Sequence, residues 1–233
     1  MYKISENIKV IAFDADDTLW VNETYFRDAE VAFAKLLAKY ETQNKIDQEL
    51  FKKEIENLKH YGYGVKGFVL SMVECALELS NYNVNQKTIE AILNIGKEMI
   101  DKPIELLDGV EEVLQSLQRK YKVIVATKGD LLDQERKLEK SNLLKYFHHI
   151  EVMSDKKEKD YTKLINHLDV EPSEFLMIGN SLKSDVLPLI ALGASAIHVP
   201  FHTTWVHEEV SDEEKSDSDY KTVAKIKEIL RFL

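Results

Sequence analysis

Short, mostly apolar runs separated by helix-length segments constrain the fold of this chain more than any other feature of its sequence. The runs read VIAF from Val10, VIVA from Val123, HHIEVM from His148, FLMIG from Phe175 and SAIHVP from Ser195. Runs of this length are too short for helices and are typical of strands buried on both faces of a parallel sheet. Strands joined by helices need crossover connections, so the pattern predicts an α/β fold with a doubly wound parallel sheet.

One long stretch interrupts this alternation. From Tyr25 to Ile100 the apolar residues recur at three- and four-residue steps, which predicts two pairs of helices and no strand. Glu105–Val110 follows as a return linker. We therefore expect an all-helical domain over residues 21–104, inserted after the first strand, and a core domain built from residues 1–20 and 105–233.

The composition is that of an ordinary globular protein, with 44% hydrophobic residues and a formal net charge of -10. This charge argues against binding a nucleic acid polymer or an anionic membrane surface, so a phosphorylated substrate needs local positive charge. The amino terminus lacks a signal-peptide pattern, and no apolar run approaches the ~20 residues of a membrane helix, so we expect a cytoplasmic protein.

Two further expectations concern single segments. Cys75 is the only cysteine, and its place in an apolar pattern predicts a core thiol. The acid-rich stretch from Glu208 to Asp219 is expected to be a solvated loop, to which we assign no function, and Tyr220–Phe232 a closing helix.

Three acidic side chains follow the first apolar run, in the sequence FDADDTLW, and Asp14 and Asp16 are the two considered first. Ligands of open parallel sheets bind beyond the carboxyl ends of the strands, so Asp14 is expected at a binding site, with Asp16 one turn of loop further on. Two carboxylates this close repel unless a cation or a proton intervenes, and both solutions suit chemistry on a phosphate ester. One acid can attack while the other carries protons. The alternative is an acidic turn in which Asp17 or Thr18 caps a helix.

Polar residues also follow three other predicted strands. Thr127, in ATKGD, either holds a phosphoryl oxygen together with backbone amides of the next helix, or only caps that helix. Lys156, Lys157 and Lys159 follow the third run, and one buried lysine there would offset the charge of the acids. The turn GNSLKSD follows FLMI and ends in Asp185, which can also be a helix cap.

These four segments resemble, in this order, the four signatures of the haloacid dehalogenase-like (HAD) hydrolases, a superfamily of mostly magnesium-dependent phosphatases. The resemblance spans Val10 to Asp185. It implies a Rossmann-like core with the inserted helices as a cap domain. It also implies a phosphoric monoester hydrolase that cleaves a small phosphorylated metabolite, a nucleoside monophosphate or a sugar phosphate, while the oligomeric state is not readable.

The resemblance assigns catalytic roles to four residues. Asp14 attacks phosphorus and forms an aspartyl-phosphate, and Asp16 acts first as acid and then as base. Thr127 and Lys156 hold the phosphoryl oxygens. Lys156 is preferred over the two neighbouring lysines because its spacing from the GNS turn resembles that of the family.

The resemblance also implies a Mg²⁺ site. Its oxygen ligands would be Asp14, the backbone carbonyl of Asp16, Asn180 or a water that it orients, and Asp185. Asn180 stands where the family commonly has an aspartate. The amide removes one negative charge, so we expect weaker metal binding and more reliance on Asp185.

Substrate contacts are expected outside the signatures. The segment YGYGVKG, residues 61–67, interrupts the inserted helices with three glycines. It is either a helix-helix turn with Tyr61 and Tyr63 packed beneath it or a loop that contacts substrate. We assign Tyr63, Lys66 and Lys128 to substrate binding.

Three other functions remain open. A phosphomutase of the same superfamily would use the same core. A metal-free haloacid dehalogenase has no leaving alkoxide to protonate, so the presence of Asp16 argues against this function. Asn180 is the one feature that favours it. A non-catalytic binding protein on the same scaffold is the third.

Overall fold

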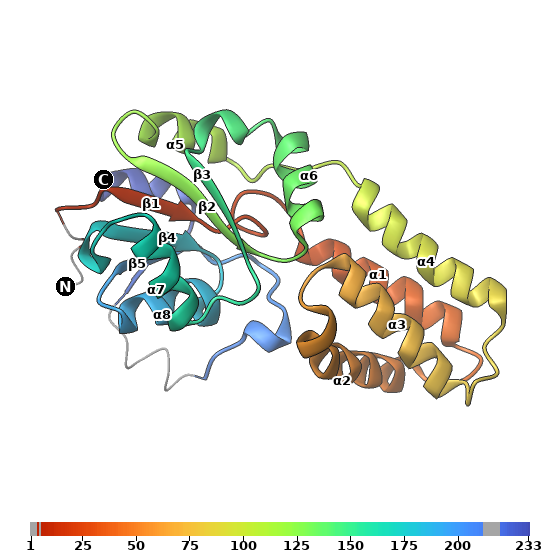
Figure 1. Cartoon of the computed structure of the whole chain (residues 1–233). Helices are drawn as coiled ribbons and strands as arrows, with labels where there is room; N and C mark the ends of the chain where they lie inside the picture. Colours follow the sequence, from red (N-terminus) through yellow and green to blue (C-terminus); the bar gives the residue numbers. More distant parts are fainter. Residues whose placement is uncertain (1–3, 5, 212–219) are drawn as a thin grey trace. The chain divides into compact units, whose positions relative to one another are not determined.

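The computed structural model describes residues 4, 6–211 and 220–233 (Figure 1). The chain divides into two compact units. The first consists of residues 1–23, 104–128 and 134–233, and the second of residues 24–103 and 129–133. In the described residues, no helix is long and apolar enough to cross a membrane. Most of the predicted acid-rich loop, residues 212–219, lies outside the described residues.

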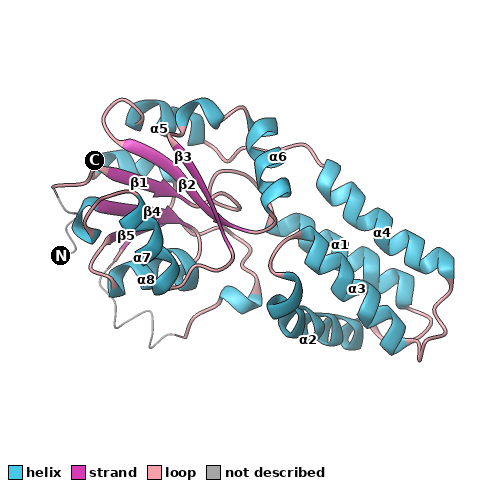
Figure 2. Ribbon diagram, in the orientation of Figure 1, coloured by secondary structure: helices cyan, strands magenta, loops and turns pink. Residues whose placement is uncertain are grey.

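The first unit contains a parallel sheet, which confirms the predicted α/β fold (Figure 2). Its strand order is β3-β2-β1-β4-β5-β6, so β1 lies in the middle and pairs with β2 and β4. The strands are β1 (Val10–Phe13), β2 (Lys122–Lys128), β3 (His149–Met153), β4 (Phe175–Gly179), β5 (Ser195–His198) and β6 (Lys221–Thr222).

Both faces of the sheet are buried, which explains why the strands are apolar at consecutive positions. On one face Ile11 and Phe13 pack with α5 (Val110–Leu117) and α6 (Leu131–Ser141). On the other face Val10 and Ala12 pack with α7 (Glu158–His167) and α8 (Leu187–Ala191). Because all strands are parallel, their carboxyl ends meet at one edge of the sheet, where the polar segments of the sequence follow them.

The prediction of a closing helix over Tyr220–Phe232 is wrong. Lys221 and Thr222 instead form β6, which extends the sheet beside β5, and the 3₁₀ helix η5 (Ile226–Arg231) follows. Ile226 and Ile229 are buried in the core. Their three-residue spacing fits a 3₁₀ turn as well as one face of an α-helix, so the sequence pattern does not separate the two.

The second unit contains four helices, α1 (Glu23–Leu37, whose first residue belongs to the first unit), α2 (Gln43–Tyr61), α3 (Val65–Leu79) and α4 (Gln86–Asp101). Their apolar faces enclose a core of their own. Gly96 of α4 allows a close approach to α3, since a Cβ there would lie 2.3 Å from Cγ2 of Val69. Cys75 is buried in this core, as predicted, and burial raises the pKa of its thiol to about 12.

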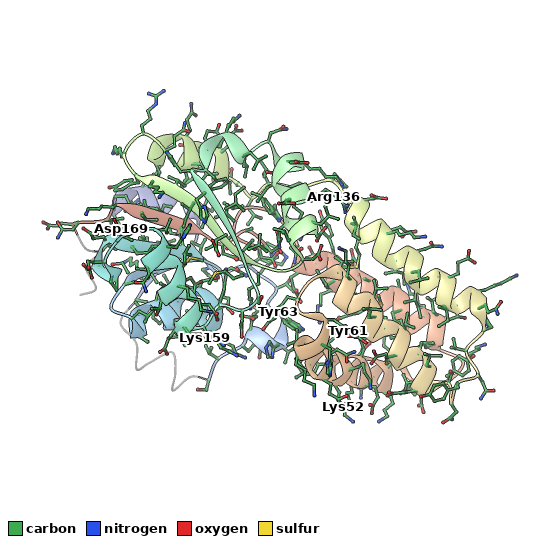
Figure 3. All side chains as sticks on the ribbon, in the orientation of Figure 1. Lys52, Tyr61, Tyr63, Arg136, Lys159 and Asp169 are labelled. Carbon is green, nitrogen blue, oxygen red and sulfur yellow. The ribbon has the colours of Figure 1, made fainter. Side chains whose placement is uncertain are left out.

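The glycine-containing segment 61–67 connects α2 and α3. Gly62 and Gly64 adopt positive φ angles of 70° and 106°, a conformation that favours glycine. Tyr61, labelled in Figure 3, is 43% exposed, and its hydroxyl donates to Glu74, so the interpretation that Tyr61 packs beneath the turn is wrong. The aromatic ring instead remains at the surface because Glu74, on α3, gives its hydroxyl an acceptor there.

Candidate active site

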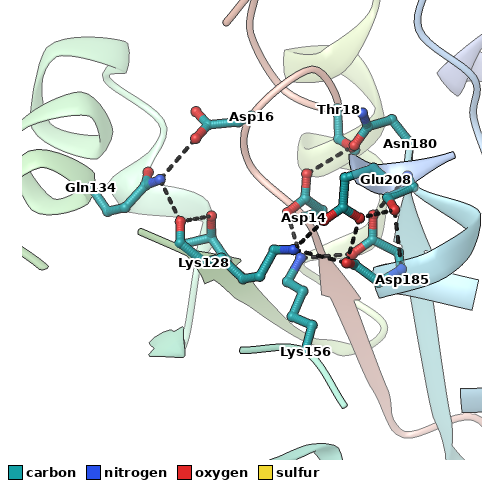
Figure 4. Close-up of polar contacts among 12 residues, drawn as sticks. Asp14, Asp16, Thr18, Lys128, Gln134, Lys156, Asn180, Asp185 and Glu208 are labelled. Carbon is teal, nitrogen blue, oxygen red and sulfur yellow. Dashed lines mark hydrogen bonds and ion pairs between the residues drawn. The ribbon is translucent and has the colours of Figure 1, made fainter. Parts of the chain in front are cut away.

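The central feature of the first unit is a lysine buried between two carboxylates at the carboxyl edge of the sheet (Figure 4). Asp14 follows β1, Lys156 follows β3 and Asp185 follows β4. Lys156 is only 3% exposed, and its Nζ donates to Oδ1 of Asp14 and, at 2.7 Å, to Oδ1 of Asp185. The fold thus gathers three sequence-predicted site residues from distant segments.

Burial and neighbouring charges shift the pKa values of Asp14 and Lys156 in opposite directions. Burial raises the pKa of Asp14 to about 7, although the Lys156 ammonium lowers it. Burial lowers the pKa of Lys156, but the two carboxylates outweigh it and hold this pKa well above its usual value. Lys156 therefore stays charged where it faces Asp14. By contrast, Lys157, which precedes α7, and Lys159 of α7 are exposed. Figure 3 shows Lys159.

Asp16 points away from this group and is held by donors of its own. Its Oδ1 accepts from Nε1 of Trp20 at 2.7 Å and from Nζ of Lys137 at 2.9 Å. Its Oδ2 accepts from Nε2 of Gln134 at 2.9 Å. The neighbouring Asp17 accepts from the backbone nitrogens at the start of α1, which agrees with the capping interpretation for that residue alone. Asp16 is therefore not part of the cap and remains available for chemistry.

Asn180 completes a cluster of oxygen atoms beside Asp14. One terminal atom of its amide lies 3.2 Å from Oδ2 of Asp14, from the carbonyl oxygen of Asp16 and from the hydroxyl of Thr18. The hydrogen-bonding pattern favours the orientation in which the amide nitrogen faces these three acceptors. A cation would instead attract the amide oxygen to the same place.

This cluster fits the donor set that Mg²⁺ prefers. Adjacent ligand oxygens of an octahedral Mg²⁺, each about 2.1 Å from the ion, lie about 3 Å apart. The separations of 3.2 Å between the Asn180 amide atom and the oxygens of Asp14 and Asp16 are close to this value. Within the described residues, no three His, Cys, Asp or Glu side chains cluster to hold a metal, so the set depends on one backbone and one amide oxygen.

Asp185 is not a helix cap, which the sequence left open as an alternative. It lies within the π-helical turn η3 (Leu182–Val186), which Ser181 begins by accepting from the nitrogen of Ser184. Oδ2 of Asp185 accepts from the nitrogen of Ser181 at 3.0 Å while Oδ1 faces Lys156. A Cβ at Gly179 would lie 2.2 Å from Oδ2 of Asp185, which explains the glycine of the GNS turn. Both carboxylate oxygens are thus engaged in orienting Lys156 and the turn.

Thr127 and Lys128 end β2 at the same edge of the sheet. Thr127 is buried, and its hydroxyl donates to the carbonyl of Lys128 at 3.3 Å. Thr127 is not the helix cap, because the nitrogen of Asp133 donates to Asp130 instead. Nζ of Lys128 donates to Glu208 at 2.6 Å and to Ser184 at 2.8 Å. Lys128 therefore brings no uncompensated charge to a substrate.

The prediction that Glu208 lies in a solvated loop is wrong, because its side chain is 13% exposed and pairs with Lys128. Its carboxylate accepts from Lys128 and from the hydroxyls of Ser181 and Ser184. Burial raises the pKa of Glu208, but the ammonium and the hydroxyls outweigh it and bring this pKa down to about 2. The network ties the end of β2 to the turn that carries Asp185.

We expect the Lys128–Glu208 pair to be a stabilising unit. Their side chains are 14% and 13% exposed. Lys128→Met and Glu208→Gln should each lower the free energy of unfolding by about 3 kcal/mol, because each leaves a buried charge unpaired. The loss of unfolding free energy in the double variant should be smaller than the sum of the two single losses by about 1–3 kcal/mol. Urea unfolding of all four proteins measures this coupling.

The matched control is the exposed pair Lys145–Glu111, with side chains 59% and 54% exposed. Its coupling should stay below about 1 kcal/mol. Equal coupling in the two pairs would contradict the stabilising role.

The two remaining predicted substrate residues belong to the second unit. Lys66 donates to Asp130 at 2.8 Å within that unit, and Tyr63 precedes Gly64 in the connection between α2 and α3. Their contact with substrate stays a prediction.

Four residues of the site were missed by sequence reasoning: Trp20, Gln134, Lys137 and Glu208. Gln134 and Lys137 are three residues apart in α6, so they lie on one face of it, which is a weak signal that the sequence does carry. Glu208 carries no signal, because it is one acid among several in a polar stretch.

Comparisons with known proteins show which proteins this chain is similar to. A family model described as haloacid dehalogenase-like hydrolase matches residues 8–193. The N-acylneuraminate-9-phosphatases of Homo sapiens and Mus musculus are 24% and 25% identical to the chain over 211 residues, which cover 86% of this chain and 83% of theirs.

Solved structures give the same picture. A haloacid dehalogenase-like family hydrolase from Xanthomonas campestris is 37% identical, with a TM-score of 0.80 over 90% of this chain and 88% of that chain. A putative HAD-hydrolase from Bacillus subtilis, whose structure is bound to magnesium, has a TM-score of 0.68 over 98% of this chain and 99% of that chain. At 16% identity the latter likeness concerns the fold alone.

Proposed function

The chain belongs to the haloacid dehalogenase-like hydrolases and is a phosphoric monoester hydrolase of that family, and on this premise we propose that it cleaves a small phosphorylated metabolite through an aspartyl-phosphate on Asp14. The observation that carries the proposal is the buried group in which Lys156 joins Asp14 and Asp185. A carboxylate held beside a permanent positive charge is oriented for attack, and the same charge stabilises phosphoryl oxygens.

The charge balance of the site supports a requirement for a metal ion. Among the described residues of the site, three ammonium groups are paired with carboxylates: Lys156 with Asp14 and Asp185, Lys128 with Glu208, and Lys137 with Asp16. With all groups ionised, the carboxylates outnumber the ammonium groups. A phosphate dianion would therefore be repelled without a further cation, and we propose Mg²⁺ held by Asp14, the carbonyl of Asp16 and Asn180.

Asp185 would act on this ion through water, because both of its oxygens already accept hydrogen bonds. When bound, Mg²⁺ would neutralise negative charge on the phosphoryl group.

The residues of this chain then divide the reaction into two displacements. Oδ2 of Asp14 belongs to the oxygen cluster, so Oδ1, which faces Lys156, attacks phosphorus, and the bond to the leaving oxygen breaks. Asp16 gives the leaving oxygen a proton and later takes one from the water that attacks phosphorus and releases Asp14. Thr127 and Lys156 hold phosphoryl oxygens. Asp16 would transfer this proton through Oδ2, because Oδ1 already accepts two hydrogen bonds.

The relatives help to narrow the substrate class. The two curated relatives named above are N-acylneuraminate-9-phosphatases, and because N-acylneuraminate is a sugar acid, they favour a sugar phosphate over a nucleoside monophosphate as the substrate. Phosphate release from a panel of both classes, with Mg²⁺ and with a chelator, tests the proposal. We expect phosphate release to stop with the chelator and to return with Mg²⁺. Halide release from a haloacid that persists with the chelator would instead indicate the dehalogenase alternative.

The phosphomutase alternative shares all of these residues and differs only in the acceptor of the phosphoryl group. Analysis of the products separates the two, since a mutase retains the phosphate on another hydroxyl. Absence of phosphate release and of transfer on the whole panel would favour the non-catalytic alternative.

Asn180→Asp is expected to strengthen Mg²⁺ binding severalfold. The substitution keeps the shape of the side chain and adds a carboxylate to the oxygen cluster, and ligand charge is a main determinant of affinity for hard cations. Calorimetric titration of the protein with Mg²⁺ measures the change directly, and the Mg²⁺ concentration for half-maximal phosphate release should fall in parallel. Asn166→Asp, an equal change at an exposed position of α7, should alter neither quantity. Unchanged affinity in the Asn180 variant would remove this residue from the metal site.

A further inference from the structure

The carboxylate of Asp16 is held from three sides by groups that the proposed reaction does not itself require. Oδ1 accepts from Nε1 of Trp20 and Nζ of Lys137, and Oδ2 accepts from Nε2 of Gln134, at distances between 2.7 and 2.9 Å. We call these three donors the Asp16 clamp. Because they approach from the loop after β1 and from α6, they fix both the position and the rotation of the carboxylate. Figure 4 shows the contact between Gln134 and Asp16.

Gln134 shows that this arrangement is maintained at a cost. Its side chain is 2% exposed, and Nε2 donates both to Asp16 and, at 2.8 Å, to the carbonyl of Lys128. Its Oε1 is buried without a hydrogen-bond partner among the described residues. A buried acceptor left unpaired destabilises the folded state. Turning the amide would aim its oxygen at two other acceptors, so the orientation is set by Asp16 and the end of β2.

The other two donors are equally restricted. Trp20 is fully buried, so its indole has no freedom to rotate away from Asp16. Nζ of Lys137 also donates to Oδ1 of Asn22 at 2.8 Å, which fixes the ammonium between two acceptors. The clamp is therefore a rigid support and not a set of alternative rotamers.

We propose that Trp20, Gln134 and Lys137 are positioning residues that hold Asp16 as the proton carrier of the reaction. This inference rests on the proposed function. With the two acceptor sites of Oδ1 occupied, the clamp leaves one acceptor site of Oδ2 to carry the proton. A proton is transferred efficiently only over hydrogen-bond distance, so a loose Asp16 would lose its effect on strongly basic leaving groups first.

The signature of such a role is a dependence on the leaving group. The phenolate of an aryl phosphate such as p-nitrophenyl phosphate departs without a proton, whereas the alkoxide of an alkyl phosphate needs one. Gln134→Met and Lys137→Met keep the length of the side chains and remove the donors. Each should lower kcat/KM for the alkyl phosphate by about tenfold or more, and for the aryl phosphate by less than about threefold. We compare kcat/KM because it reports the steps up to and including departure of the leaving group.

Three further variants complete the experiment. Asp16→Asn should show the same selectivity between the substrates more strongly, and Trp20→Phe, which keeps a ring and loses the N–H, should show it in weaker form. Lys140→Met changes an exposed lysine of the same helix and should affect neither substrate. Thermal unfolding of each variant confirms that the fold is retained.

The outcomes separate the inference from the function on which it rests. Equal losses on both substrates, or no loss on either, in Gln134→Met and Lys137→Met would overturn the clamp while leaving the phosphatase in place. A wild-type protein that releases phosphate from neither substrate would overturn the proposed function and the clamp with it.

Discussion

Asp14→Asn is expected to lower phosphate release by about 10⁴-fold or more, on the scale that removal of a catalytic nucleophile shows in other enzymes. The amide has the shape of the carboxylate but cannot form the phosphoryl-enzyme bond. It also leaves Lys156 paired with Asp185 alone. Initial rates with an aryl phosphate at saturating Mg²⁺ measure the effect.

The matched control for this variant is Asp169→Asn. Asp169 is exposed, follows α7 and has a φ of 57°, a conformation that asparagine accepts as readily as aspartate. Its turnover should equal that of the wild type. Full activity of Asp14→Asn on a phosphate ester would reject the mechanism, because no other described carboxylate pairs with Lys156 except Asp185, and both oxygens of Asp185 are engaged.

Lys156→Met is expected to reduce both stability and turnover. The variant leaves Asp14 and Asp185 buried against each other without their shared cation, and breaking a buried pair in this way costs about 3–5 kcal/mol of unfolding free energy. Turnover should fall by about 10²–10³-fold, as for the loss of one stabiliser of transition-state charge. Urea unfolding and initial rates measure the two effects separately.

The neighbouring lysine provides the control. The side chain of Lys157 is 69% exposed and pairs with Asp155 at 2.7 Å. Lys157→Met should cost less than about 1 kcal/mol, as exposed ion pairs do, and leave turnover unchanged. If the two methionine variants behaved alike, the choice of Lys156 from three adjacent candidates would be wrong.

These two variants and the clamp variants address different parts of the same site. Asp14 and Lys156 concern the attack on phosphorus, whereas Trp20, Gln134 and Lys137 concern the proton of the leaving group. A loss that is equal for all substrates is expected from the first pair, and a loss that depends on the leaving group from the second set.

The sequence predicted the features that local patterns encode. Each buried strand appears as an apolar run, since both faces of a parallel sheet are covered, and the acid at the end of the first run marks a binding edge. The helical stretch between the first two strands was equally readable from its three- and four-residue periodicity. The closing segment was not, because Ile226 and Ile229 are spaced to suit either an α-helix or a 3₁₀ turn.

The tertiary structure alone decided how the charges are paired. Nothing in the sequence distinguishes Lys156 from its neighbours except a family spacing, yet burial between two carboxylates separates it from Lys157 and Lys159. Glu208 reads as one more surface acid, and only the folded chain brings it to Lys128. The physical reason is that hydrophobic periodicity records which face of an element is buried, whereas ion pairs and hydrogen bonds form between side chains from distant segments, whose meeting depends on the complete fold.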